Sequence, residues 1–358
     1  MIINYVNYIL QQLGNKEQFM RKSAILITGA NGEVGHGLIA ALHQKNIRNI
    51  VTLDLNPLDD SISALANEEL MGNILDQSLI EQLNGEYEFD TIYHLAAILS
   101  TRAEFSPQSA HDVNVGGTLN LLNLALEQGR SQGKTVKFFF PSSIAVYGFS
   151  GLDEKNSSGA IKEDSFRNPT TMYGCNKLYC EHLGNYYTNN YQRLGAEMHQ
   201  SYIDFRSIRF PGIISSKTIP TGGTSDYIPE MLHAAARGVS YKCFVREDTQ
   251  IPFMTMPDAI LAITHLMSAP KDNISRTVYN IRSFAPTAEE FRQKVLEYYP
   301  EAQIDYEISE KRQKMVDSWP ADTDDSMAKN DWNWTPAFNL DLGMKDYLVP
   351  DLQQMYKN

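Results

Sequence analysis

The chain has 358 residues, of which 42% are hydrophobic and 21% charged, as is typical of a folded globular protein. Its formal net charge of −12 repels phosphate backbones, so we expect no nucleic-acid partner. No apolar run approaches the roughly 20 residues that span a bilayer, so we expect no membrane partner either. Three cysteines are too few for a disulfide framework or a metal cluster, which favours a cytoplasmic protein without a metal site.

Residues 1–22 are predicted to form an N-terminal extension, because they precede the first clear strand. Their apolar side chains recur at near-helical spacing, which indicates a short helix or a frayed tail. A secretory signal is disfavoured, since no basic segment precedes the apolar part and Asn and Gln interrupt it.

From residue 24 onward, short apolar runs alternate with amphipathic segments. Strands are predicted over 24–28, 50–54, 70–71, 91–95, 136–140 and 203–210, and helices over 35–44, 111–128 and 172–187. This alternation predicts an α/β fold with a doubly wound parallel sheet of the Rossmann type.

After residue 214 the alternation becomes less regular. Helices are predicted over 226–237, 257–267 and 287–298, with short strands near 242–245 and 277–281. The segments 151–168, 188–201 and 215–225 are predicted to be loops or insertions. We therefore expect the C-terminal part to be a smaller lobe of mixed α/β structure.

A glycine-rich turn joins the first strand to the first helix. Its pattern, GxxGxxG, suits a dinucleotide, because glycines permit a tight turn, a close approach of pyrophosphate and close packing of helix on sheet. The helix N-terminus adds free N–H groups for the diphosphate. The candidate cofactor-binding residues of this turn are Gly29, Asn31, Gly32, Glu33, Val34 and Gly35.

Further cofactor-binding candidates follow the later strands. Asp54 ends the second strand, where a carboxylate accepts the ribose hydroxyls and repels a 2′-phosphate, so NAD is favoured over NADP. Asn114, in the helix after the fourth strand, is predicted to hold a kink or a water, unless it is an ordinary surface residue. The other candidates are Asn73 and Ile74 beside the adenine, the run Leu95, Ala96 and Ala97 against the cofactor, and Pro211 and Ile213 beyond the strand over 203–210.

Tyr173 and Lys177 are the predicted catalytic pair. The two residues are at positions i and i+4, so their side chains lie on one helix face and can reach the same edge of a cofactor. Both are therefore also predicted to bind the cofactor. A neighbouring ammonium is expected to lower the pKa of the phenol, so that Tyr173 can take the proton of an alcohol while hydride leaves for nicotinamide. Ser143, preferred to Ser142, ends the fifth strand and is predicted to bind the substrate oxygen.

The order of these features resembles the extended short-chain dehydrogenase/reductase superfamily across residues 23–282. The resemblance implies that Ser143 is the hydroxyl donor, Tyr173 the acid/base and Lys177 its electrostatic partner. It also implies an NAD-binding Rossmann domain over 23–214 and a substrate-binding lobe over 215–358, with the sheet partly completed by later segments.

Within that superfamily, the stretches 222–227 (GGTSDY) and 254–259 (MTMPDA) resemble the metal-independent L-threonine 3-dehydrogenases. The resemblance implies oxidation of L-threonine at C3 to 2-amino-3-oxobutanoate, with hydride transfer to NAD, in threonine catabolism. Two alternatives stay open, namely an NAD-dependent sugar-nucleotide epimerase or dehydratase and a non-catalytic NAD-binding regulator.

The substrate-binding candidates lie beyond the fourth strand and in the lobe. Ser100, Thr224 and the backbone of Gly223 are candidates for the carboxylate, beside Ser143 and Tyr173 at the hydroxyl. Asp226 is predicted either to attract the ammonium or to cap the next helix, and Trp319 is either a lid or a core residue. Helices 111–128 and 172–187 carry more than one apolar stripe, and the resemblance to the superfamily, in which the corresponding helices often pair across a two-fold axis, implies a homodimer.

Overall fold

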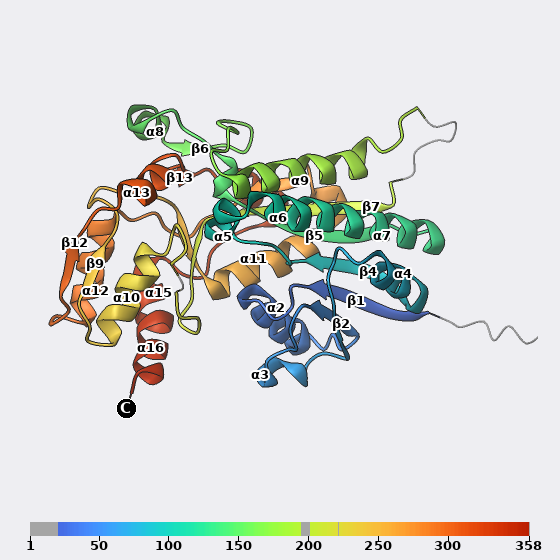
Figure 1. Cartoon of the computed structure of the whole chain (residues 1–358), viewed down its shortest axis with the longest axis horizontal. Helices are drawn as coiled ribbons and strands as arrows, with labels where there is room; N and C mark the ends of the chain where they lie inside the picture. Colours follow the sequence, from blue (N-terminus) through green and yellow to red (C-terminus); the bar gives the residue numbers. More distant parts are fainter. Residues whose placement is uncertain (1–20, 195–200, 221, 358) are drawn as a thin grey trace, which may run out of the picture.

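The computed structural model describes residues 21–194, 201–220 and 222–357 (Figure 1). Nearly all of the predicted N-terminal extension, residues 1–20, lies outside the described residues. A seven-stranded sheet forms the centre of the fold, in the order β3-β2-β1-β4-β5-β7-β11, and all of its neighbouring strands run parallel. Its strands are β1 (Lys22–Thr28), β2 (Ile50–Asp54), β3 (Glu68–Met71), β4 (Tyr87–His94), β5 (Val136–Ser143), β7 (Ile203–Phe210) and β11 (Val278–Asn280).

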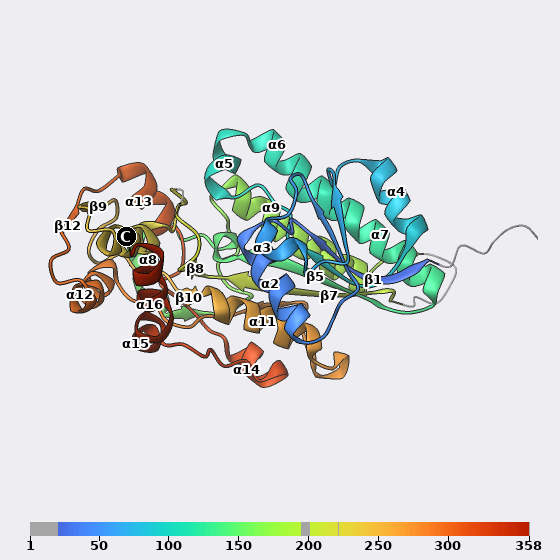
Figure 2. The same cartoon turned by 90° about the horizontal axis from the view of Figure 1, so that it is seen from below.

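Helices cover both faces of this sheet, as Figure 2 shows. On β1, Ile25 and Ile27 face a core shared with α2 (Glu33–Gln44), α11 (Met256–Ser268) and α14 (Ser326–Trp332). The alternate residues Ala24 and Leu26 face a second core, shared with α4 (Gln77–Glu86), α7 (Gly117–Gln132) and α9 (Met172–Asn189). Burial on both sides explains why the first strand is a continuous apolar run rather than an alternating one.

The helix predicted over 111–128 is longer and less regular than expected. It consists of α6 (Pro107–His111), a π-helical turn η1 (Asp112–Gly116) and α7, which ends at Gly133 in the left-handed conformation. The other short helices of the N-terminal part are α3 (Asp60–Ser63), α5 (Ser100–Phe105) and the 3-10 turn η2 (Ile144–Val146).

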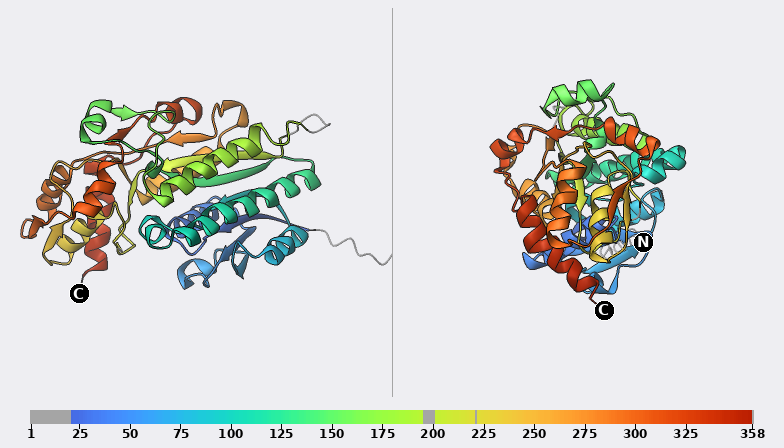
Figure 3. Two further views of the ribbon diagram at one scale, coloured as in Figure 1. Left: turned by 45° about the horizontal axis from the view of Figure 1, so that its top comes forward. Right: turned by 90° about the vertical axis from the view of Figure 1, so that its left-hand side faces the viewer.

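The C-terminal part forms a second lobe around its own apolar core (Figure 3). Three two-stranded pairs brace it: β8 (Gly212–Ile214) with β10 (Phe253–Thr255), β9 (Tyr241–Cys243) with β12 (Ile304–Tyr306), and β6 (Ala160–Ile161) with β13 (Asp322–Thr323). Its helices are α10 (Tyr227–Ala236), α12 (Ala288–Tyr298), α13 (Glu310–Asp317), α15 (Leu340–Gly343) and α16 (Val349–Met355), with η4 (Met344–Leu348) between the last two.

The segment 151–168, predicted to be a loop or an insertion, has secondary structure of its own. It contains α8 (Leu152–Ser158), which is held by the lobe, and strand β6, which is held by β13 of the lobe and by β11 of the central sheet. Lys155 Nζ donates to Val316 O at 3.2 Å, and Asn280 Nδ2 donates to Ile161 O at 3.0 Å. These long-range bonds stabilise elements that are too short to form on their own.

The chain crosses back from the lobe to the sheet before it ends. Helix α11 packs on the sheet, β11 forms its edge, and the 3-10 turn η3 (Lys271–Asn273) lies between them. Among the helices of the described residues, none has both the length and the hydropathy needed to cross a membrane.

Candidate active site

The glycine turn meets the loop after β4. Gly29 has a φ of +67°, and a Cβ atom there would lie 2.5 Å from Ala96 N, so only glycine fits. A Cβ atom on Gly35 would lie 2.2 Å from Ala30 O, which explains how closely α2 packs on the turn. Gly32 occupies the N-cap of α2 and has no side chain to bond the first amides, so these are available to a diphosphate.

Asp54 lies at the carboxyl end of β2, facing this turn. Its Oδ2 accepts a hydrogen bond from Asn31 N at 3.0 Å, and its Oδ1 accepts from Asn56 N at 3.2 Å. The Asn31 side chain in turn accepts from Asp59 N at 3.0 Å and so holds the loop after β2. The carboxylate is therefore fixed beside the glycine turn, where the adenosine ribose of a dinucleotide would lie.

The remaining cofactor candidates differ in exposure. Glu33 and Asn73 are exposed, Val34 and the run 95–97 are half-buried, and Pro211 is buried next to half-buried Ile213. Asn73 Oδ1 accepts from Leu75 N at 3.0 Å, which shapes the turn after β3. Ile74 is 6% exposed and packs against Gly117, so its side chain belongs to the core.

Asn114 is buried in the π-helical turn and joins three elements. Its side chain accepts from Ile98 N at 2.7 Å and donates to Ile98 O at 3.0 Å, which fixes the loop after β4. Its carbonyl oxygen accepts from the Thr118 hydroxyl and from Cys180 Sγ, the latter at 3.3 Å. Asn114 is thus a buried structural link, and the surface alternative is excluded.

His94 belongs to the same network, although the sequence analysis gave it no role. Its Nδ1 lies 2.8 Å from Thr28 Oγ1, and its Nε2 lies 2.9 Å from Thr118 Oγ1. Since the Thr118 hydroxyl donates to Asn114 O, we assign the ring proton to Nε2. Burial, with the nearby charge of Lys177, lowers the pKa of His94 to about 3, so the ring is neutral.

The two serines at the end of β5 have different partners. Ser142 is buried and donates to Glu181 Oε1 at 2.5 Å. Ser143 is half-buried, and its Oγ accepts from Ala145 N at 3.1 Å, so its hydroxyl hydrogen can still be donated to a substrate oxygen. These contacts favour Ser143 over Ser142 as the substrate-binding hydroxyl.

Gly174 brings helix α9, which carries Tyr173 and Lys177, onto the turn that follows Ser143. A Cβ atom at Gly174 would lie 2.0 Å from Ala145 O, so the α9 backbone touches this turn directly. The side chain of Thr171 caps α9 by accepting from Gly174 N at 3.1 Å. Tyr173 therefore begins its helix next to the end of β5.

Lys177 lies one turn further along α9 and is 3% exposed. Its Nζ is 5.4 Å from the centroid of the Tyr173 ring and 4.5 Å from that of Phe140. Within residues 21–194, 201–220 and 222–357, the contacts of this ammonium are these two aromatic rings, which leaves its N–H donors available to a cofactor.

Burial dominates the electrostatics of this pair. It lowers the pKa of Lys177 to about 8 and raises the pKa of Tyr173 above its ordinary value. The lowering of the Tyr173 pKa that was expected from the sequence is therefore wrong for the chain alone. Desolvation of the phenol by burial is the cause of this rise.

A buried ion pair fixes helix α9 to the sheet. Arg209 donates to both oxygens of Glu181, at 2.8 Å from Nε and 2.6 Å from Nη2. Its other contacts are Tyr147 Oη at 2.8 Å and Glu163 O at 2.6 Å. Together with the Ser142 bond, this pair fixes the end of β5 relative to α9.

Two of the predicted substrate residues, Ser100 and Thr224, come together although they lie more than 100 residues apart in the sequence. Ser100 Oγ, at the start of α5, lies 3.4 Å from Thr224 Oγ1 in the loop before α10. Asp226 occupies the N-cap of α10, but its carboxylate accepts from Gly223 N at 2.6 Å instead of from the helix amides. Arg312, which the sequence analysis did not single out, donates to Gly223 O at 2.5 Å.

Trp319 lies in the core of the lobe with 4% of its surface exposed. Its indole Nε1 is buried and finds no partner in the described part of the chain. This burial agrees with the core alternative for Trp319 rather than with a lid.

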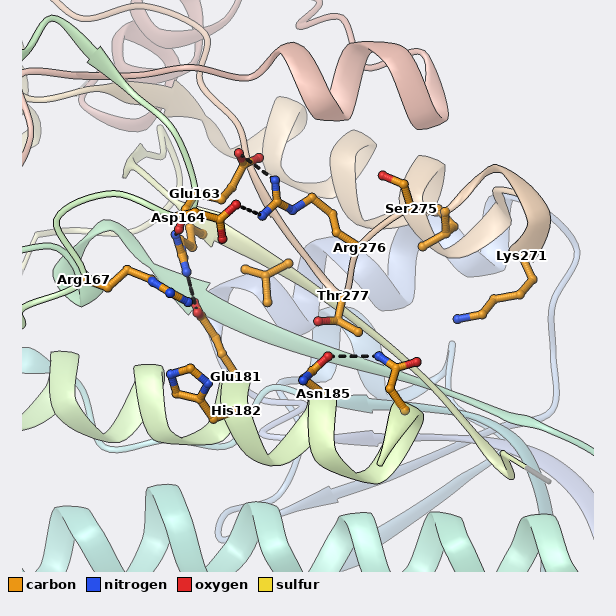
Figure 4. Close-up of a pocket in the computed structure, with 14 residues that line it drawn as sticks. Glu163, Asp164, Arg167, Glu181, His182, Asn185, Lys271, Ser275, Arg276 and Thr277 are labelled. Carbon is orange, nitrogen blue, oxygen red and sulfur yellow. Dashed lines mark hydrogen bonds and ion pairs between the residues drawn. The ribbon is translucent and has the colours of Figure 1, made fainter. Parts of the chain in front are cut away.

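A separate cavity of about 490 Å³ lies beside α9 and the edge strand β11 (Figure 4). Its wall includes Glu181 and Arg209 of the buried pair, together with Arg276, which contacts Glu163 and Asp164 at 3.2 and 2.9 Å. None of the predicted cofactor, catalytic or substrate residues lines it. In the described residues, no group of three or more His, Cys, Asp or Glu side chains is arranged to hold a metal ion.

Comparison with known proteins identifies its relatives. The mitochondrial L-threonine 3-dehydrogenase of Bos taurus is 32% identical over 317 residues, covering 88% of this chain and 79% of the relative. A holo structure of L-threonine dehydrogenase from Cupriavidus necator is 35% identical, covers 93% of this chain and 100% of its own, and has a TM-score of 0.79. A monomeric L-threonine 3-dehydrogenase from a metagenome, in its apo form, is 33% identical with the coverages 93% and 100% and a TM-score of 0.80.

These matches confirm the predicted doubly wound sheet and the resemblance to extended short-chain dehydrogenases and to the threonine dehydrogenases among them. Residues 25–281 match the NAD dependent epimerase/dehydratase family. The chain therefore belongs to this family of enzymes, and its cofactor is NAD.

Proposed function

We propose that this protein oxidises the C3 hydroxyl of L-threonine and passes the hydride to NAD, forming 2-amino-3-oxobutanoate. The observation that carries the proposal is the packing of the Tyr173 helix, through Gly174, onto the turn after Ser143. The relatives named L-threonine 3-dehydrogenase support the choice of substrate.

In the proposed reaction, Tyr173 takes the proton of the substrate hydroxyl and Ser143 donates a hydrogen bond to the same oxygen. Lys177 supplies positive charge from one helical turn away and offers its unpaired N–H donors to the cofactor ribose. When bound, NAD accepts the hydride, and its cationic nicotinamide adds the charge that favours the tyrosinate.

The polar groups between the domain and the lobe are proposed to hold the amino-acid end of the substrate. Ser100 and Thr224, whose hydroxyl oxygens lie 3.4 Å apart, would donate to the carboxylate, with the backbone of Gly223 beside them. Asp226 would attract the ammonium, and its bond to Gly223 N would then keep the carboxylate in place. Trp319 is proposed to support this pocket from the core of the lobe.

We further propose a cytoplasmic homodimer that pairs through α7 and α9, with a domain boundary near residue 214. The exposed apolar side chains Leu119, Tyr179 and Tyr186 on these helices support the dimer. Light scattering decides between this state and the monomer described for one relative.

Accumulation of NADH distinguishes the proposal from its alternatives. A sugar-nucleotide epimerase regenerates NAD within each turnover, and a regulator turns over nothing. We expect NADH absorbance to rise with L-threonine and not with UDP-sugars. Cofactor binding without net reduction on any hydroxy-amino acid would instead support the regulator, and conversion of a UDP-sugar the epimerase.

A further inference from the structure

The environment of the Lys177 ammonium is unusual for a buried cation. The side chain is 3% exposed, and in the described part of the chain its Nζ has aromatic faces where hydrogen-bond acceptors are usual. The nearer face is that of Phe140, with the centroid 4.5 Å from Nζ. A cation within about 6 Å of a ring centroid is attracted by the negative face of the ring.

Phe140 itself is held firmly in place. It is 3% exposed near the end of β5, and its ring stacks on Phe205 with a centroid distance of 5.9 Å. Its ring centroid also lies 6.2 Å from that of His94. The ring is therefore a fixed surface under the lysine and cannot turn away from it.

We propose that Phe140 is a positioning residue, which binds the Lys177 ammonium through a cation–π contact and keeps it charged and close to Tyr173. This inference rests on the proposed function, because it assigns the ring a role in preparing the catalytic pair. It adds a residue that sequence motifs do not mark, since a phenylalanine in a buried strand looks like any other core residue.

The titratable groups described around Lys177 are either neutral or shared with other partners, so an aromatic contact can help to hold its charge. On α9, the carboxylate of Glu181 favours the charged lysine but is shared with Arg209 and Ser142. On β4, His94 is neutral, and on α9 the burial of Cys180 raises the pKa of its thiol to about 11. Tyr173 is neutral in the chain alone because burial raises its pKa.

Phe138 provides a matched control on the same strand and the same sheet face. Its ring stacks on Phe205 at 5.8 Å and lies 6.1 Å from His94, almost as Phe140 does. Of these two phenylalanines, Phe140 is the one whose ring faces the Lys177 ammonium. A change that weakens the negative face of the ring without changing its shape should therefore affect the titration of Lys177 at position 140 and not at position 138.

The test replaces each phenylalanine in turn by a trifluorinated phenylalanine, which nearly preserves the shape and removes most of the negative ring face. The titration of Lys177 is followed in the cofactor-free chain by NMR of lysines labelled with carbon-13 at Cε, its signal being assigned with Lys177→Arg. We expect the midpoint to fall by about half a pH unit or more at position 140, and by clearly less at 138. An unchanged midpoint at 140, or equal shifts at both positions, would overturn the proposal.

Turnover is measured on the same proteins. Fluorination at position 140 should lower kcat/KM for L-threonine most strongly at alkaline pH, where Lys177 loses its charge first. If the unmodified chain oxidises no threonine while the Lys177 midpoint still shifts only at 140, the proposed function fails and the cation–π contact stands. If threonine is oxidised and the Lys177 midpoint does not move at position 140, the proposed function stands and the cation–π proposal fails.

Discussion

At the scale of single residues, the site is defined by a few side chains whose chemistry depends on burial. Tyr173 is a weaker acid in the chain alone than in water, and Lys177 loses its proton more easily. The two changes have the same cause, because desolvation penalises the charged form of either group. In the proposed reaction, the Tyr173–Lys177 pair therefore depends on further charge from the bound cofactor.

Replacing Tyr173 with Phe removes the general base and keeps the ring. We expect kcat to fall by about 10²-fold or more while NAD binding is retained. Turnover is measured from NADH formation, and cofactor binding by calorimetry. Unchanged turnover would refute the role assigned to Tyr173.

Replacing Asp54 with Ala removes the acceptor beside the glycine turn. We expect the affinity for NAD to fall about tenfold or more, and the discrimination against NADP to relax. The exposed Asp60→Ala variant, only six residues away, is the control and should bind NAD normally. Equal NAD affinities for both variants would show that the ribose contact is wrongly assigned.

At the scale of elements, close contacts between helices and strand ends decide the geometry. Gly174→Ala tests this directly, because alanine is the better helix former by about 1 kcal/mol but its Cβ would lie 2.0 Å from Ala145 O. We expect loss of activity together with loss of stability. The control is Gly85→Ala, since nothing lies within 4 Å of a Cβ atom at Gly85. If Gly174→Ala is as stable and active as this control, α9 does not depend on the contact.

The buried His94 links β1, β4 and α7, and it gives folding a dependence on pH. Its pKa is about 3 in the folded chain and 6.5 when unperturbed, so below pH 6.5 the unfolded chain binds a proton that the folded chain does not. Stability is therefore lost as the pH falls from 6.5, by about 1.4 kcal/mol per unit for this one group. Urea unfolding between pH 7 and pH 5 should show a shallower decline for His94→Gln than for the unchanged chain. If the stability of both chains falls equally with pH, His94 is not the group that causes the pH dependence.

Sequence patterns predicted most of this architecture, and the exceptions have physical causes. The strands over 24–28 and 203–210 were recognisable because burial on both faces demands continuous apolar runs. The elements within 151–168 were missed because they depend on partners such as Val316 and Asn280, more than 100 residues away.

The candidate site was predictable to a similar extent, and for related reasons. The glycine turn, Asp54 and the Tyr173–Lys177 pair have characteristic spacings, so they stand out in the sequence. The Glu181–Arg209 pair, the place of His94 and the ring under Lys177 have none, because they arise only when distant strands and helices pack together.

At the scale of the whole molecule, the ends of the sheet strands carry candidate cofactor residues such as Asp54, and the loop before α10 brings Thr224 Oγ1 to 3.4 Å from Ser100 Oγ. Helix α11 and strand β11 return from the lobe to the sheet, so packed elements join the lobe to the sheet in addition to the connecting segments of the chain. This arrangement supports chemistry on a small substrate held between the two parts.

The most direct test of this account uses L-threonine that carries deuterium at C3. We predict that the deuterium appears in the reduced cofactor, at a rate that falls by about 10²-fold or more in Tyr173→Phe. A reduced cofactor without deuterium, or no reduced cofactor at all from a chain that binds NAD, would contradict it.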